Sequence, residues 1–189
     1  MPLPPPPPRE ELHARRLEIR GYRREDGLYD VEAHLVDTKT STIRLASGRT
    51  LAAGEPLHEM WVRLVVDEDL QVHEVQACTD AAPWPVCPDA AAAMRSLVGL
   101  RIGSGWSSAV RQRLGGRAGC THLTELLAPL GSTAFQTLTP VRMQRPQAVD
   151  DSGRPTKIDS CWAYASDREP VRLLWPAFHD GPGSPRDGG

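Results

Sequence analysis

The sequence predicts an α+β fold, with helices packed on one face of a mostly antiparallel sheet. Two observations lead to this class. β-Rich runs occur in pairs around short turns in the first half of the chain, and segments with helical periodicity follow them. The 189 residues are 40% hydrophobic and 24% charged, which is enough to bury one substantial core. We therefore expect one domain over residues 10–178, between a disordered proline-rich tail at 1–9 and a disordered glycine- and proline-rich tail at 179–189.

Two hairpins are predicted to form the sheet. Residues 17–22 and 28–37 flank an Asp-Gly turn signal, and residues 57–66 and 70–77 flank a short acidic turn. A short strand is also expected at 43–45. In the second run, the apolar residues of the core face alternate with polar residues that include His34; they are Tyr29, Val31, Ala33 and Leu35. By the same alternation, His58 shares its face with the apolar residues of the third run.

Three helices are expected in the second half. The first covers about residues 90–98 after Pro88, and the second runs from about Ser104 to Leu114. The third begins near Thr121, with Thr121 or Thr124 as a cap, and Pro129 should kink or divide it. A closing hairpin is predicted from residues 160–164 and 171–174.

Several functional classes are disfavoured by composition. A formal net charge of −2 argues against a general nucleic-acid binder, which needs an excess of Lys and Arg. No apolar run resembles a secretory signal or approaches the ~20 residues of a membrane span. The four cysteines form no C-x-x-C pair, so they are expected to be free thiols or metal ligands rather than disulfides. The protein is expected in the cytoplasm, without nucleic-acid or membrane partners.

The stretch most suggestive of chemistry is the glycine-rich loop 115–119, which leads through Cys120 into a helix that carries His122. Glycines allow close backbone approaches, and the positive end of a helix favours the thiolate form of cysteine. The thiolate is the form that binds metals or attacks electrophiles. Cys120 is therefore a candidate catalytic nucleophile or sulfur or acyl carrier, with His122 as the nearest base.

A shared metal site is the leading hypothesis. Its ligands would be two thiolates and two imidazoles that lie at strand starts or helix entrances, namely His58, Cys87, Cys120 and His122. Such a set suits tetrahedral zinc and also accommodates iron. Two alternatives are a lone reactive Cys120, and packing thiols beside a hydrogen-bonded His122.

Other polar residues have simpler interpretations. Arg111, Arg113 and Arg117 are expected either to form a solvated face or to bind a small anionic ligand near the glycine-rich loop. Asp26, Asp30 and Asp37 are interpreted as turn and solvent-face carboxylates, with a metal-binding or acid–base role as the alternative.

Four segments resemble a bacterial family of unknown function, number 2889. The residues that carry the likeness are 24–30, 56–60, 97–100 and 119–126, and the similar region spans roughly residues 10–178. The family has no established activity, so this resemblance alone implies no reaction.

A more distant likeness is to iron–sulfur scaffold proteins of the IscU/NifU type. Cys120 matches the last cluster-binding cysteine of the scaffold, followed in step by Leu123 and Glu125, and His58 falls at its aspartate. Pro56 and Gly119 stand where the scaffold has its first cysteine and its histidine, and the nearest counterpart of its middle cysteine is the displaced Cys87. The resemblance therefore implies an IscU-like core and a rearranged mononuclear metal site. Two functional classes remain open: an enzyme, and a binding or accessory protein that acts on a partner protein.

Overall fold

The computed structural model describes residues 3–181, and the chain divides into two compact units at Arg142. The first unit comprises residues 1–142 and the second 143–189. The single predicted domain over 10–178 spans both units. The division falls just after Pro140, where the apolar periodicity of the sequence stops. Residues 3–9 form no helix or strand, and most of the C-terminal tail predicted from residue 179 lies outside the described residues.

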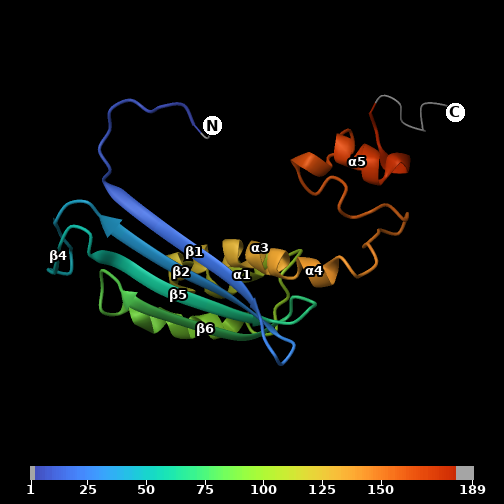
Figure 1. Ribbon diagram of the computed structural model, residues 1–189. Helices are drawn as coiled ribbons and strands as arrows, with labels where there is room; N and C mark the ends of the chain where they lie inside the picture. Colours follow the sequence, from blue (N-terminus) through green and yellow to red (C-terminus); the bar gives the residue numbers. More distant parts are fainter. Residues whose placement is uncertain (1–2, 182–189) are drawn as a thin grey trace. The chain divides into compact units, whose positions relative to one another are not determined.

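The first unit is built on a four-stranded antiparallel sheet in the order β1-β2-β5-β6 (Figure 1). Its strands are β1 (His13–Arg23), β2 (Tyr29–Lys39), β5 (Pro56–Val66) and β6 (Val72–Ala81). They correspond to the four predicted hairpin strands; β1 begins four residues earlier and β6 ends four residues later than predicted, because pairing continues there. Between β2 and β5 the chain forms a small two-stranded ribbon, made by β3 (Ile43–Arg44) and β4 (Thr50–Leu51).

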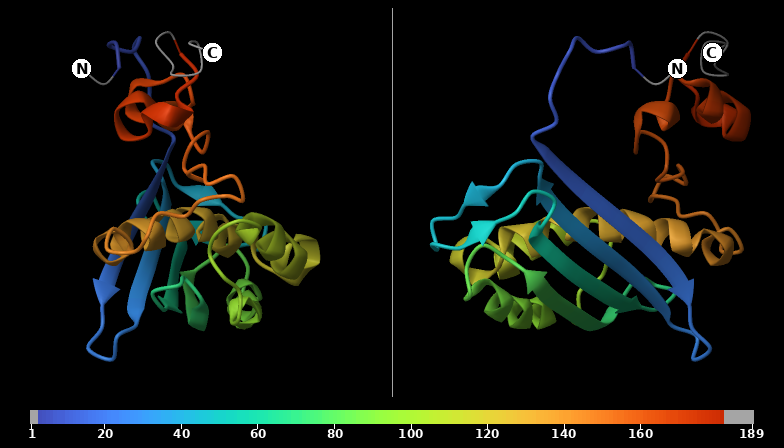
Figure 2. Two further views of the ribbon diagram at one scale, coloured as in Figure 1. Left: turned by 90° about the vertical axis from the view of Figure 1, so that its right-hand side faces the viewer. Right: turned by 60° about the vertical axis from the view of Figure 1, so that its left-hand side comes forward.

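Helices cover one face of this sheet, so the predicted α+β class is confirmed (Figure 2). In chain order they are η1 (Cys87–Leu97), α1 (Trp106–Leu114), η2 (Gly116–Ala118), α2 (Thr121–Glu125), α3 (Leu127–Thr137) and α4 (Thr139–Arg142). The division between α2 and α3 falls at Leu126. Pro129 therefore lies in the first turn of α3, where its missing N–H needs no partner. Among residues 3–181, no helix is long and apolar enough to cross a membrane.

The hydrophobic core lies between the sheet and the helices. It includes the predicted odd-numbered row of β2 together with Met60, Val62 and Leu64 of β5. From the helices come buried side chains of η1, α1 and α3, such as Leu97, Trp106 and Leu130. The indole N–H of Trp106 donates to the backbone carbonyl of Leu127, which satisfies a polar group inside the core.

In its described part, residues 143–181, the second unit contains three short helical turns, η3 (Trp162–Tyr164), α5 (Glu169–Leu174) and η4 (Pro176–Phe178). The predicted closing hairpin at 160–164 and 171–174 is therefore wrong. Pro170 lies at the beginning of α5, a position that suits proline because its backbone angle is helical and no donor is needed there. The aromatic and β-branched residues of these runs indicated strands. The proline at position 170 instead favours the beginning of a helix, and a helix forms there.

The contact between β1 and α3 depends on Gly21. A Cβ atom at this position would lie 1.8 Å from Oγ1 of Thr137 and 2.8 Å from its Cβ and Cγ2 atoms. We expect Gly21→Ala to lower the free energy of unfolding by about 1–3 kcal/mol, because a methyl group in a filled contact must displace its neighbours. Urea denaturation measures the change. Thr137→Ala should recover part of the loss in the double variant, because it removes Oγ1 and Cγ2 but keeps Cβ, and a Gly21→Ala protein of unchanged stability would contradict this packing.

Candidate functional site

A buried carboxylate lies at the end of the core-facing row of β2. Asp37 is 1% exposed, so its interpretation as a solvent-face residue is wrong. It continues the same alternation as Leu35, and the alternation places it on the inner face. Its two oxygens accept hydrogen bonds from Arg15 of β1, with Nε to Oδ1 at 2.7 Å and Nη2 to Oδ2 at 2.8 Å. Nη1 of Arg15 also donates to Glu125 of α2 at 2.7 Å.

His58 occupies the neighbouring position on β5, and it is buried, as its place in the strand predicts. Arg15, Asp37 and His58 are direct pairing partners across three adjacent strands. Nδ1 of His58 lies 3.0 Å from Oδ2 of Asp37. A carboxylate held by a guanidinium is ionised and can only accept, so Nδ1 carries the proton and Nε2 keeps its lone pair.

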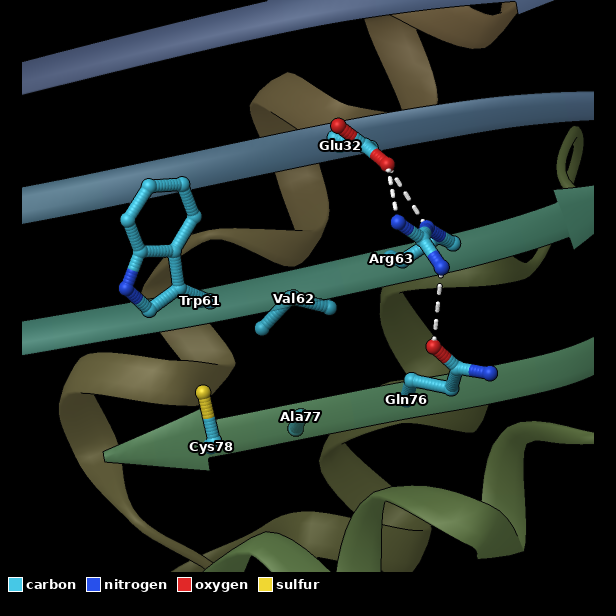
Figure 3. A pocket seen from close by; sticks show the side chains of 7 residues that line it. All are labelled: Glu32, Trp61, Val62, Arg63, Gln76, Ala77 and Cys78. Atoms are coloured by element: carbon cyan, nitrogen blue, oxygen red, sulfur yellow. Dashed lines mark hydrogen bonds and ion pairs between the residues drawn. The ribbon is translucent and has the colours of Figure 1, made fainter. Parts of the chain in front are cut away.

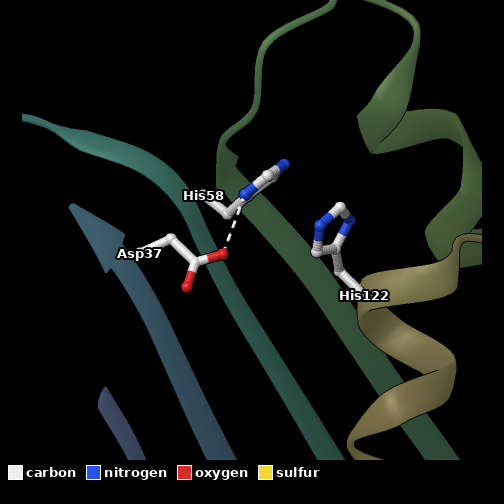
Figure 4. Close-up of side chains that lie close together, drawn as sticks. All are labelled: Asp37, His58 and His122. Carbon is white, nitrogen blue, oxygen red and sulfur yellow. Dashed lines mark hydrogen bonds and ion pairs between the residues drawn. The ribbon is translucent and has the colours of Figure 1, made fainter. Parts of the chain in front are cut away.

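His122 of α2 completes a group of three potential metal ligands (Figure 4). Its ring lies against that of His58, with the centroids 3.8 Å apart and the planes tilted by 32°. One ligand atom from each of Asp37, His58 and His122 lies within 4.8 Å of the others. The sequence-predicted pair His58 and His122 is thus brought together, and Asp37 joins it.

The electrostatics of the group favour an ionised carboxylate and a neutral imidazole. Burial by itself would raise the pKa of Asp37, but the hydrogen bonds and charge of Arg15 outweigh it and hold the pKa below its usual value. Burial lowers the pKa of His58, and the nearby His122 lowers it further, against the opposing effect of Asp37. A neutral imidazole with a free lone pair is the form that binds a metal ion or accepts a proton.

Cys120 lies at the border of this group. It is partly buried, precedes α2 in an extended conformation, and its Sγ atom is 4.0 Å from Nδ1 of His122. The predicted threonine cap is wrong, because α2 has no side-chain cap. Thr124 instead donates its hydroxyl hydrogen to the carbonyl oxygen of Cys120 at 2.8 Å. This bond fixes the backbone that carries the thiol.

The remaining sequence-derived candidates are placed as follows. Cys87 is the first residue of η1 and does not belong to the group of three. Arg111 and Arg113 lie in the last turn of α1, and Arg117 in η2, all with exposed side chains. Arg113 donates a hydrogen bond to the carbonyl oxygen of Ser96.

Sequence reasoning missed two members of the site. Asp37 could have been found from the alternation of β2, because residue 37 is the next odd position after Leu35. Arg15 gave no comparable signal. It is one of several arginines near the N-terminus, and only the pairing of β1 with β2 brings it to Asp37. His13 also approaches, with Nε2 3.5 Å from Oδ1 of Asp37.

The open face of the sheet contains a shallow depression of about 440 Å³ (Figure 3). Trp61 and Arg63 of β5 and Cys78 of β6 lie along it. The guanidinium of Arg63 is already held by Glu32 at 2.6 Å and by Gln76 at 3.0 Å. This depression therefore offers the exposed indole of Trp61 but no free cation. The group formed by Asp37, His58 and His122 lies on the opposite face, which the helices cover.

Comparison with known proteins identifies the family. Residues 13–136 match the family described as "Protein of unknown function (DUF2889)", which covers the whole sheet and most of the helical layer. The chain belongs to this family, as the sequence resemblance indicated. No curated protein and no solved structure gives a significant match to the chain.

The buried imidazole predicts a pH dependence of stability. Because the pKa of His58 is lower in the folded state than its ordinary 6.5, the unfolded chain binds more protons in the window between the two values. Stability should therefore be complete above about pH 6.5 and decrease as the pH falls through the folded pKa. His58→Asn keeps an N–H donor for Asp37 but cannot titrate. With chelator present, urea denaturation between pH 7.5 and 5 should show that the free energy of unfolding falls more steeply for wild type than for His58→Asn. An equal pH dependence of the two proteins would contradict the assignment.

Proposed function

We propose that this protein binds a transition-metal ion, zinc or iron, at His58, His122 and Cys120, with Asp37 holding His58 in place. The observation that supports it is the buried carboxylate–imidazole pair facing a second imidazole. A carboxylate that accepts the N–H of a histidine fixes the ring and its tautomer, and metal-binding histidines commonly have such a partner. In this arrangement Nε2 of His58 is the ligand atom.

Cys120 lies outside the group whose ligand atoms are within 4.8 Å of one another, but its distance from His122 approaches that expected around a tetrahedral ion. With metal–nitrogen and metal–sulfur distances of about 2.0 and 2.3 Å, a nitrogen and a sulfur ligand lie about 3.6 Å apart. Sγ of Cys120 and Nδ1 of His122 are 4.0 Å apart, so a small movement brings both into range. The lone pairs of imidazoles lie in the ring planes, and the two rings here face each other. Ligation would therefore turn His122, the more exposed of the two.

The charge around Asp37 favours borderline ions over hard ones. Both carboxylate oxygens accept hydrogen bonds from Arg15, so the site lacks the free oxygen ligands that calcium and magnesium require. Imidazole and thiolate are the donors that zinc and iron take. The positive guanidinium beside the carboxylate further weakens the attraction for an ion that depends on charge alone.

The wider proposal is a metal-binding accessory protein of the bacterial cytoplasm. The likeness to IscU/NifU scaffolds, the cytoplasmic location, and the anionic ligand or partner protein stay predictions. A structural metal would raise the melting temperature, because it binds the folded chain and not the unfolded one. A catalytic metal would instead be required for turnover, with little effect on melting.

Metal binding is tested with cobalt as a spectroscopic substitute. Purified wild-type protein should take up one Co²⁺ ion and show d–d absorption typical of tetrahedral coordination. His58→Ala and His122→Ala should abolish binding, and Asp37→Asn should weaken it about 10–100-fold, the usual effect of losing a partner that orients a ligand. Cys120→Ser should remove the thiolate-to-cobalt absorption in the near ultraviolet.

The matched control is Cys87→Ser, because both cysteines lie at a helix entrance outside the group of three, but Cys120 is the one whose Sγ atom lies 4.0 Å from His122. Its affinity and spectrum should equal those of wild type. Metal affinity that is unchanged by His122→Ala would refute the site. Loss of binding in Cys87→Ser would instead support the four-ligand set predicted from the sequence.

A second candidate function is cysteine-dependent chemistry at Cys120. The observation that favours it is the thiol–imidazole pair, with the His58–Asp37 pair behind it. An imidazole that accepts the thiol proton activates the nucleophile. The sequence suggested that a helix N-terminus and a nearby arginine would stabilise the thiolate. In the structure α2 has only five residues, and Arg117 is exposed on η2. Arg111, Arg113 and Arg117 as an anion-binding set stay a prediction.

Alkylation rates separate the two functions. Cys78 and Cys161 are both exposed. Burial and Asp80 still raise the pKa of Cys78, which leaves Cys161 as the reference thiol. If Cys120 is a nucleophile, iodoacetamide should label it fastest, and His122→Gln should slow it several-fold without changing Cys161. If it is a ligand, labelling should be slow until chelator is added. Slow labelling under all conditions would contradict both functions.

A further inference from the structure

A second groove runs along the outer edge of β6, beside η1, with a volume of about 690 Å³. β6 is the last strand of the sheet. Its first residue, Val72, exchanges hydrogen bonds with Gly99 and Leu100. Among residues 3–181, no strand pairs with the outer edge of residues 73–77, which span about 17 Å. The backbone groups along this edge are available to an incoming strand.

The opposite wall of the groove is a 3₁₀-helix, and its geometry explains the shape. Residues three apart are eclipsed in such a helix. One column of η1, containing Met94 and Leu97, is buried in the core. The next column contains Ala92, Arg95 and Val98, and all three line the groove. The alanine keeps one end of the groove open, and Val98, 44% exposed, gives the other end an apolar surface.

Arg95 lies in the middle of that column and is exposed. Within residues 3–181, its side chain makes no hydrogen bond or ion pair, unlike Arg63 on the open face. Because the wall continues on both sides of it, through Ala92 and Val98, an occupant that reaches Arg95 would extend past it in both directions. A carboxylate at this point would therefore be an internal side chain and not the end of a chain.

We propose that this groove binds an extended segment of a partner protein by strand addition to β6. The segment has apolar side chains that lie against Ala92 and Val98, and an internal Asp or Glu that pairs with Arg95. Main-chain hydrogen bonds to an edge strand supply affinity in this mode, and the pockets for alternate side chains supply specificity. The proposal does not depend on the metal site, because it rests on different residues.

The test begins with a library of random nine-residue segments, displayed with both ends fused so that no free terminus is available. It is selected on the full-length protein, with removal of sequences that bind Ala92→Trp. Ala92 is exposed, so tryptophan fills the groove without disturbing the core. Enriched sequences should alternate β-branched residues with an Asp or Glu at a fixed position. Failure to enrich any sequence that needs the open groove would overturn the proposal.

The best segment is then synthesised and titrated by fluorescence anisotropy. Arg95→Glu should weaken binding at least tenfold and should favour the same peptide with Lys in place of its acid. Arg16→Glu is the matched control, an equal charge reversal at an exposed arginine of β1, and should leave the affinity unchanged. N-methylation of alternate amides should abolish binding. Equal effects of the two reversals would overturn the pairing with Arg95. If the wild-type protein is a dimer and Arg95→Glu dissociates it, the groove binds a second copy of this chain, and the proposal of a partner segment is overturned.

Discussion

The Arg15–Asp37 pair is the contact on which this part of the fold depends. An ionised carboxylate that is 1% exposed costs several kcal/mol unless it is paired and fully hydrogen-bonded. Arg15 supplies two of the bonds and His58 a third. Because the guanidinium also reaches Glu125, one side chain links β1, β2 and α2. Arg15 thereby links α2, which carries His122, to the edge of the sheet.

Strand register is determined by the same contacts. Arg15, Asp37 and His58 pair across three strands, so a slip of two residues, which keeps the apolar row on its face, would still separate the charged groups. The buried pair thus specifies register more strictly than the apolar row alone, in which neighbouring Val and Leu side chains can replace each other. This specificity is a reason for a sheet to keep a charge in its core face, where an apolar residue would stabilise the fold more simply.

The proposed site and the edge groove lie in different parts of one sheet. His58 is near the start of β5, whereas the groove residue nearest to it along the ladder, Ala77, pairs with Val62, four residues further on. At about 3.4 Å per residue this is roughly 13 Å along the strand. The proposed metal site faces the helices and the groove lies at the sheet edge, so a substitution in one should leave the contacts of the other intact.

The sequence by itself determined the α+β class, the four long strands, the core-facing position of His58, and the meeting of Cys120 and His122 at a helix entrance. These features follow from local periodicity, turn residues and glycines, which act over a few neighbouring positions. It did not determine the roles of Arg15 and Asp37 or the place of Cys87 outside the group. Those depend on which strands pair and which helix covers them. Arg15 and Glu125 are 110 residues apart, and no local pattern can bring a guanidinium to a carboxylate over that separation. Only the packing of α2 across the end of the sheet makes the contact.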